Sequence, residues 1–141
     1  MRYRTAAHSR FTIYYHIALV IKYRRKVLTL PKINHKLKAV IKNMAPYHDW
    51  VIKEVETDED HVHVLLSAPP RYSPSKVVKL IKTWTQRKTF FEYPEIRRFL
   101  WGGKLWTQGF YVSTVSDNTT KIEMQKYIKN QNRKLKQQRL L

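Results

Sequence analysis

Apolar and polar residues follow strand and helix periods in turn along the first half of the chain. Residues 11–23 are rich in β-branched and aromatic side chains between basic flanks, which predicts a buried strand. Residues 32–45 repeat apolar side chains at spacings of three and four, which predicts an amphipathic helix. Residues 50–57 and 61–67 predict two further strands. The acidic turn between them would join them into a hairpin. Its acidic residues are interpreted first as a solvated tip, and second as charges that raise the basicity of the neighbouring histidines.

The second half of the chain continues with a helix, a strand and a last helix. Residues 75–91 follow a Ser-Pro-Ser start and place apolar side chains broadly on one helical face. An irregular basic and aromatic stretch follows, over residues 92–108. Residues 109–115 predict a strand, and a final helix is expected from about 119 to 134.

This order of elements, β-α-β-β-α-β followed by a helix, predicts an α+β fold of the ferredoxin-like type. In that fold, four strands form one antiparallel sheet with helices packed on one face. RNA-recognition modules share this layout, so the fold alone does not decide the function. A length of 141 residues predicts one domain over 1–141, with a frayed tail from about residue 134.

Composition changes the picture through its charge. The chain has 28 Lys and Arg against 10 Asp and Glu, a formal net charge of +18, which favours a polyanionic partner such as DNA or RNA. It contains no cysteine, which excludes a thiolate zinc site and a Cys nucleophile. Only three glycines are present and no Gly-rich phosphate loop, so ATP is not an expected cofactor. No apolar run approaches the roughly 20 residues that span a bilayer. An anionic membrane surface is the third and weakest candidate for the basic charge, because the apolar faces of the helices are needed for the core, and no membrane partner is expected.

His61-Val62-His63 is the first candidate site. Residues two apart on a strand point to the same face, so both imidazoles would project together and could share a divalent metal ion. The alternative is a pair of exposed or packed histidines on an edge strand, which short motifs of this kind often prove to be.

Tyr127 and Gln131 form the second candidate pair, four residues apart on the last predicted helix and therefore on one face of it. Taken alone, such a tyrosine usually packs by its ring. Its basic and polar surroundings favour a second interpretation, a nucleophile whose phenolate is stabilised by positive charge. His61, His63 and the Gln131 amide oxygen could then hold one metal ion while Tyr127 attacks a phosphorus atom. Composition does not show that the helix reaches the histidines.

At these positions the sequence resembles the HUH single-tyrosine transposases (TnpA-type) of small bacterial and archaeal insertion sequences. The family name denotes His-hydrophobe-His, here His61-Val62-His63. The resemblance covers nearly the whole chain and is carried by five segments in order: Lys22-Tyr23-Arg24-Arg25, Asp60-His61-Val62-His63-Val64-Leu65, residues 75–82, residues 105–115 and Tyr127-Ile128-Lys129-Asn130-Gln131.

The resemblance implies a metal-dependent enzyme that cleaves and rejoins single-stranded DNA at element ends after binding imperfect hairpins. Tyr127 would form a 5′-phosphotyrosine intermediate without ATP, and His61, His63 and Gln131 would bind Mg²⁺ or Mn²⁺. Family members are homodimers in which the tyrosine helix of one subunit can complete the site of the other. A cytoplasmic location on a prokaryotic nucleoid is expected.

Two alternatives to this enzyme stay open: a non-catalytic single-stranded nucleic-acid-binding module, and a domesticated relative that acts on genomic palindromic repeats. In each case basic side chains would bind DNA phosphates, although any one of them could equally be a solvated charge. The candidates are Arg10, Lys22, Arg24, Arg25, Arg87, Lys88, Arg97, Arg98 and Lys104.

Overall fold

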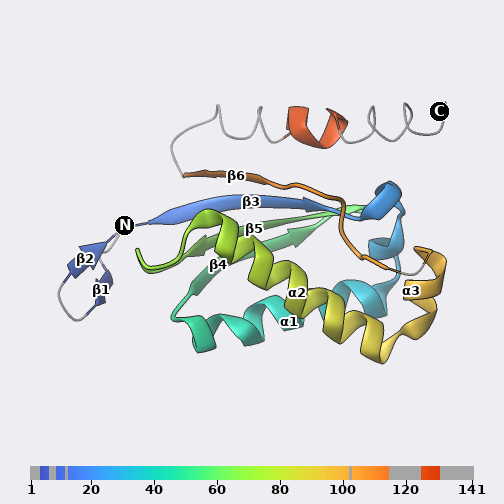
Figure 1. Ribbon diagram of the computed structural model, residues 1–141, viewed down its shortest axis with the longest axis horizontal. Coiled ribbons are helices and arrows are strands. Elements are labelled where there is room, and N and C mark those ends of the chain that lie inside the picture. Colours follow the sequence, from blue (N-terminus) through green and yellow to red (C-terminus); the bar gives the residue numbers. More distant parts are fainter. Residues whose placement is uncertain (1–3, 7–8, 12, 102, 115–124, 131–141) are drawn as a thin grey trace.

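The computed structural model describes residues 4–6, 9–11, 13–101, 103–114 and 125–130. Six strands and three α-helices follow one another in the described residues up to Thr114, with short 3₁₀ turns between some of them (Figure 1). Their bounds are β1 Arg4–Ala6, β2 Ser9–Phe11, β3 Tyr14–Val20, α1 Pro31–Met44, β4 Val51–Thr57, β5 His61–Ser67, α2 Pro74–Glu92, α3 Pro94–Phe99 and β6 Tyr111–Thr114. Residues 125–130 are also helical and are called the tyrosine helix below.

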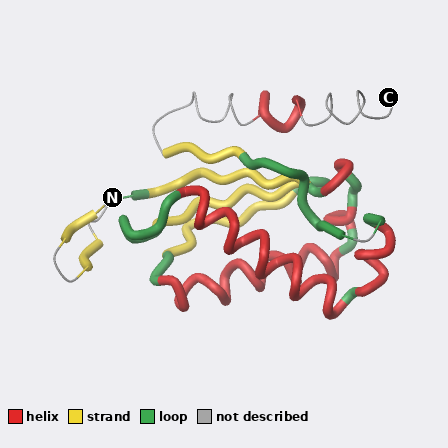
Figure 2. The backbone as a smooth tube through the Cα atoms, viewed as in Figure 1, coloured by secondary structure: helices red, strands yellow, loops and turns green. Residues whose placement is uncertain are grey.

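Four of the strands form one sheet in the order β4-β5-β3-β6, and every neighbouring pair is antiparallel. The two central strands are the first and third of the β-α-β-β-α-β series, which confirms the predicted ferredoxin-like fold. Helices α1 and α2 cover one face of the sheet, and the tyrosine helix lies over the other (Figures 1 and 2). We call this second face the open face.

The hydrophobic core fills the layer between the sheet and the two long helices. Ile17 and Leu19 of β3 point into this layer, where they meet fully buried side chains of α1 and α2 such as Leu37 and Ile81. The intervening Ala18 belongs to a small separate cluster that includes the tyrosine helix. The period-2 alternation of β3 therefore gives the sheet two packed faces.

The first strand is shorter than the sequence predicts. Residues 11–23 were expected as one strand, but β3 spans only Tyr14–Val20, and Phe11 belongs to the separate β1-β2 hairpin. The chain leaves the sheet because Tyr23 adopts a left-handed conformation with φ of 61° inside a 3₁₀ turn. Such a conformation is rare for a residue other than glycine, and apolar periodicity does not reveal it.

The stretch predicted as irregular contains one ordered helix, α3. Pro94 occupies its first turn, and Ile96 and Leu100, spaced by four, are both buried. The strand expected over residues 109–115 is confirmed as Tyr111–Thr114. The last helix is described only over 125–130, and the rest of its predicted span lies outside the described residues. None of the described helices is long and apolar enough to cross a bilayer.

Candidate active site on the open face of the sheet

The register of the sheet places the two histidines together on the open face. His61 and His63 lie two apart on β5, while Val62 between them is buried in the core. His61 is opposite Val20 and His63 is opposite Ala18 on β3. The imidazole centroids are 4.9 Å apart with an angle of 32° between the ring planes. The predicted side-by-side arrangement of the two rings is therefore confirmed.

A hydrogen-bonded chain fixes the orientation of His61. Its Nδ1 lies 2.7 Å from Oδ1 of Asp60, and Arg24 donates from Nε to the other carboxylate oxygen at 2.8 Å. A carboxylate held by a guanidinium only accepts hydrogen bonds, so Nδ1 of His61 carries the proton. In the neutral ring, Nε2 then has the free lone pair that a metal ion requires.

Asp60 departs from the main interpretation of the acidic turn. The acidic turn was expected to be solvated, and Asp58 and Glu59 are indeed exposed, but Asp60 is 93% buried, with a relative exposure of 7%. The expectation is wrong for Asp60 because its side chain turns inward to both Arg24 and His61. Its position directly before the His-x-His motif was the available signal.

His63 has a ring nitrogen that is suited to bind a metal ion. Its Nε2 is buried and has no hydrogen-bond partner among the described residues. Burial lowers the pKa of His63, and the neighbouring His61 lowers it further, although Glu56 and Asp58 act in the opposite direction. The neutral imidazole is the form that coordinates a metal. A buried unpartnered nitrogen beside a second imidazole is the environment expected of a divalent metal site.

The third predicted ligand, Gln131, lies outside the described residues. Within the described part of the chain no group of three or more His, Cys, Asp or Glu side chains is arranged to hold a metal ion. The tyrosine helix does reach the histidine side of the open face, because Gln125 lines a pocket of about 350 Å³ together with His63 and Glu56. Gln131 follows on the same segment of chain, six residues after Gln125.

The tyrosine helix is anchored to the sheet by Ile128. This side chain is 8% exposed and packs with Ala18 and Val20 of β3. Tyr127 next to it contacts the ring of Tyr111 on β6, with centroids 6.1 Å apart. The apolar side of the helix thus seats Tyr127 on the same face as the histidine pair.

Tyr127 lies over β6, however, rather than over the histidine strand. A Cβ atom built on Gly109, just before β6, would be 3.7 Å from the Tyr127 hydroxyl oxygen. The histidines are on β5, and β3 separates β5 from β6. The structure therefore brings the two halves of the predicted site onto one face, with one strand between them.

The predicted DNA contacts fall into two groups. Three of them make intramolecular contacts at the end of β3: Arg24 pairs with Asp60, the Arg25 guanidinium lies 4.8 Å from the Phe99 ring, and the Lys22 ammonium lies 5.0 Å from the Tyr23 ring. The others with described side chains are exposed, namely Arg87, Lys88, Arg97, Arg98 and Lys104. For Arg10 only the backbone, in β2, is described.

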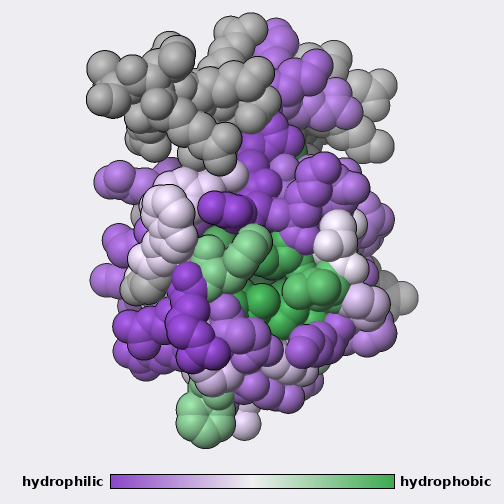
Figure 3. Space-filling view, turned by 90° about the vertical axis from the view of Figure 1, so that its right-hand side faces the viewer, coloured by the Kyte–Doolittle hydropathy of each residue, from purple (hydrophilic) through white to green (hydrophobic). Residues whose placement is uncertain are grey.

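Exposed aromatic side chains accompany these cations near α3. Figure 3 looks onto the end of the molecule that carries α3 and shows an apolar patch surrounded by hydrophilic residues. Phe99 of α3 is 49% exposed and Trp101, just after it, is 76% exposed. Exposed rings among cations suit stacking on unpaired bases.

Comparisons with known proteins identify the family of the chain. The sequence profile of the family described as "Transposase IS200 like" matches residues 9–131. The chain is 36% identical over 124 residues to the ISDra2 transposase TnpA of Deinococcus radiodurans, covering 88% of this chain and 87% of that protein. It is 30% identical over 128 residues to the transposase for insertion sequence element IS200 of Salmonella typhimurium, covering 91% and 82%.

Two solved structures share the fold. A putative transposase from Deinococcus radiodurans superposes with a TM-score of 0.82 at 30% identity, over 91% of this chain and 97% of that one. The REP-associated tyrosine transposase bound to a REP hairpin superposes with a TM-score of 0.53 at 12% identity, over 84% and 67%, a likeness of fold alone. With the profile matching most of its length and relatives at this identity, the chain belongs to the IS200-like transposase family.

Proposed function

We propose that this transposase cleaves and rejoins single-stranded DNA through a covalent bond between Tyr127 and a DNA 5′-phosphate. The observation that carries the proposal is the docking of the tyrosine helix, through Ile128, on the sheet face that presents His61 and His63. A nucleophile and a pair of metal-binding imidazoles on one face are what phosphoryl transfer requires. The net charge of +18 supplies attraction for the DNA backbone.

The chemical step exchanges one phosphodiester for another. The Tyr127 phenol gives up its proton to solvent as its oxygen attacks the scissile phosphorus, the bond from phosphorus to the 3′-oxygen breaks, and that oxygen takes up a proton from solvent. The products are a 5′-phosphotyrosine and a free 3′-OH. A 3′-OH from another strand reverses the step and regenerates the phenol, so the bond energy is conserved and no ATP is consumed.

His61 and His63, with Gln131, would hold the divalent ion, Mg²⁺ or Mn²⁺. When bound, such an ion polarises a phosphate oxygen and stabilises the charge that develops on it. Asp60 accepts a hydrogen bond from Nδ1 of His61, which leaves the lone pair of the His61 Nε2 available for the ion. The low pKa of His63 keeps that ring neutral near pH 7.

A homodimer fits the one-strand separation between Tyr127 and the histidines. In a homodimer, the tyrosine helix of one copy can complete the histidine site of the other, and two copies place two cleavage sites on one DNA complex. Hairpin DNA is the proposed partner, bound by the exposed cations, and the nucleoid of a prokaryotic cell is the proposed place of action.

The test is a covalent-adduct assay with matched tyrosine variants. Labelled single-stranded DNA spanning an element end is incubated with Mn²⁺ and analysed on a denaturing gel. The wild type and Tyr111→Phe, which loses only the neighbouring hydroxyl, should form an adduct that survives boiling. Tyr127→Phe should bind the hairpin and form none. An adduct with Tyr127→Phe would refute the assignment of the nucleophile.

The metal assignment has its own arm in the same assay. Excess chelator should abolish the adduct, and His61→Ala and His63→Ala should lose it while their hairpin binding persists. Adduct formation that continues in chelator would refute a metal-dependent reaction. Hairpin binding without an adduct from any protein, wild type included, would favour the non-catalytic binding module.

A further inference from the structure

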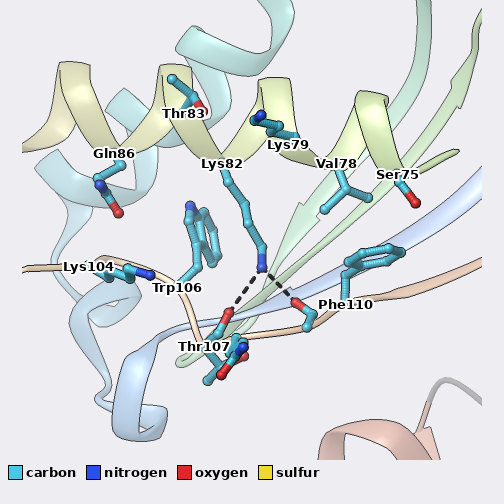
Figure 4. Close-up of a pocket in the computed structure, with 12 residues that line it drawn as sticks. Ser75, Val78, Lys79, Lys82, Thr83, Gln86, Lys104, Trp106, Thr107 and Phe110 are labelled. Carbon is cyan, nitrogen blue, oxygen red and sulfur yellow. Dashed lines mark hydrogen bonds between the residues drawn. The ribbon is translucent and has the colours of Figure 1, made fainter. Parts of the chain in front are cut away.

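A second pocket lies away from the histidines, between α2 and the segment that leads into β6. Its volume is about 370 Å³, within the usual range for ligand sites of roughly 300–1,000 Å³. Three lysines contribute to its lining, Lys79 and Lys82 from α2 and Lys104 from the opposite segment, together with Phe110 (Figure 4). No Asp or Glu is among its lining residues in the described part of the chain.

Lys82 sets the charge of this pocket. Its ammonium donates to the backbone oxygens of Thr107 at 3.0 Å and Gly109 at 2.7 Å, as the dashed lines of Figure 4 show. An ammonium group has three donors, so one remains for a further acceptor. Burial lowers the pKa of Lys82, and the charge of Lys104 lowers it further. Two cations thus line a pocket whose lining offers no carboxylate in the described part of the chain, and an anion bound there would stabilise the charged form of Lys82.

Aromatic side chains complete the pocket beside these cations. The Phe110 ring and the Lys82 side chain both line the pocket (Figure 4). Trp106 forms part of the opposite wall, and its indole nitrogen is held by a 2.9 Å hydrogen bond to Thr85, so this wall is fixed. A cationic site for a phosphate next to an aromatic ring is the combination that binds a nucleotide of a single strand.

The pocket also adjoins the proposed nucleophile. Gly109 lines the pocket, and a Cβ atom built on this residue would lie 3.7 Å from the Tyr127 hydroxyl oxygen. A strand that occupies the pocket would therefore run past Tyr127.

We propose that this pocket holds one unpaired nucleotide of the DNA strand that Tyr127 cleaves, with its phosphate at Lys82 and Lys104 and its base against Phe110. The identity of the strand rests on the proposed function, whereas the charge and shape of the pocket do not. Lys82 also ties α2 to the segment before β6, so its substitution would confound binding with stability. Lys104 is exposed and is the cleaner probe of the charge.

The test measures equilibrium binding of fluorescent hairpin DNA with a single-stranded flank, in the Tyr127→Phe background that cannot cleave. Lys104→Ala should reduce the slope of log affinity against log salt by about 0.7, the value for one single-strand phosphate contact. Lys42→Ala, the same change at an exposed position of α1, should leave the slope unchanged. Equal slopes for Lys104→Ala and Lys42→Ala would overturn the phosphate contact.

A scan of abasic sites along the flank locates the base. One abasic position should weaken binding roughly 5- to 150-fold, as loss of one stacked base does. Phe110→Leu keeps an apolar side chain but cannot stack, so the same abasic position should have no effect in that variant. If no position couples to Phe110, the nucleotide proposal is overturned and the pocket binds a phosphate only. Because no cleavage occurs in this experiment, its outcome is independent of whether Tyr127 forms an adduct.

Discussion

Replacing Asp60 by asparagine tests how the protein orients its metal ligand. The carboxylate accepts hydrogen bonds from His61 Nδ1 at 2.7 Å and from Arg24 Nε at 2.8 Å. An asparagine amide has one acceptor oxygen and one NH₂ group, so it can accept from only one of these donors. If the oxygen stays with Arg24, the NH₂ group faces His61 and favours the tautomer in which Nδ1 accepts. The proton then moves to Nε2, the nitrogen that the metal needs.

The expected losses of metal affinity and stability follow from how deeply the three side chains are buried. The Asp60 and His61 side chains are 10% and 12% exposed, and that of Arg24 is 25% exposed, so solvent replaces little of what is lost. Loss of an outer partner of a metal-binding histidine typically costs 10- to 100-fold in metal affinity, or about 1.4–2.7 kcal/mol. The loss of one hydrogen bond to a charged group adds a decrease of about 1.5–3 kcal/mol in the free energy of unfolding.

The assay is a calorimetric titration with Mn²⁺ alone, and unfolding in urea is measured in parallel. Glu59→Gln is the matched control, because it makes the same acid-to-amide change one residue earlier. Its ion pair with Lys26, at 3.4 Å, joins side chains that are 55% and 69% exposed, so little effect on stability or metal affinity is expected. A Mn²⁺ affinity of Asp60→Asn equal to those of Glu59→Gln and wild type would refute the orientation argument.

Two further substitutions test contacts that hold elements of the fold in place. Thr85→Val removes the hydroxyl that accepts a hydrogen bond from the buried Trp106 indole at 2.9 Å, and should lower the free energy of unfolding in urea by about 1–3 kcal/mol. The control Thr83→Val, on the same helix, should change that free energy by less than about 0.5 kcal/mol. Equal effects of the two substitutions would contradict the hydrogen bond between Thr85 and Trp106. Ile128→Ala should loosen the tyrosine helix by about 2 kcal/mol, the low end for a buried isoleucine. Amide exchange over residues 125–130 should then rise roughly 30-fold and adduct formation should fall, while the urea transition of the core stays in place; unchanged exchange would show that Ile128 is not the anchor.

The parts of the fold that periodicity predicts are those in which burial repeats along one element. β5 was predicted with its observed bounds, because Val62 and Val64 alternate with the histidines. α1 was predicted to within one residue at each end, because Ile33, Leu37 and Ile41 recur at helical spacing on its buried side.

The missed features depend on backbone conformation or on partners far along the chain. The left-handed turn at Tyr23, which shortens β3, leaves the apolar pattern unchanged. Asp60 looks like its exposed acidic neighbours, and only the fold brings Arg24, 36 residues earlier, to its carboxylate. The place of Tyr127 over β6 likewise depends on where Ile128 packs, which helical periodicity does not specify.

The most direct measurement of the central claim is the site of the covalent bond on the protein. The chain has nine tyrosines, and Tyr111 lies beside Tyr127, with ring centroids 6.1 Å apart. After reaction with a short single-stranded element end, the adduct is digested with nuclease and protease, and the peptide that carries the nucleotide is sequenced by mass spectrometry. A 5′-phosphate on Tyr127 is the result that the account predicts. A nucleotide on Tyr111 or on another residue, or a link through a 3′-phosphate, would contradict it.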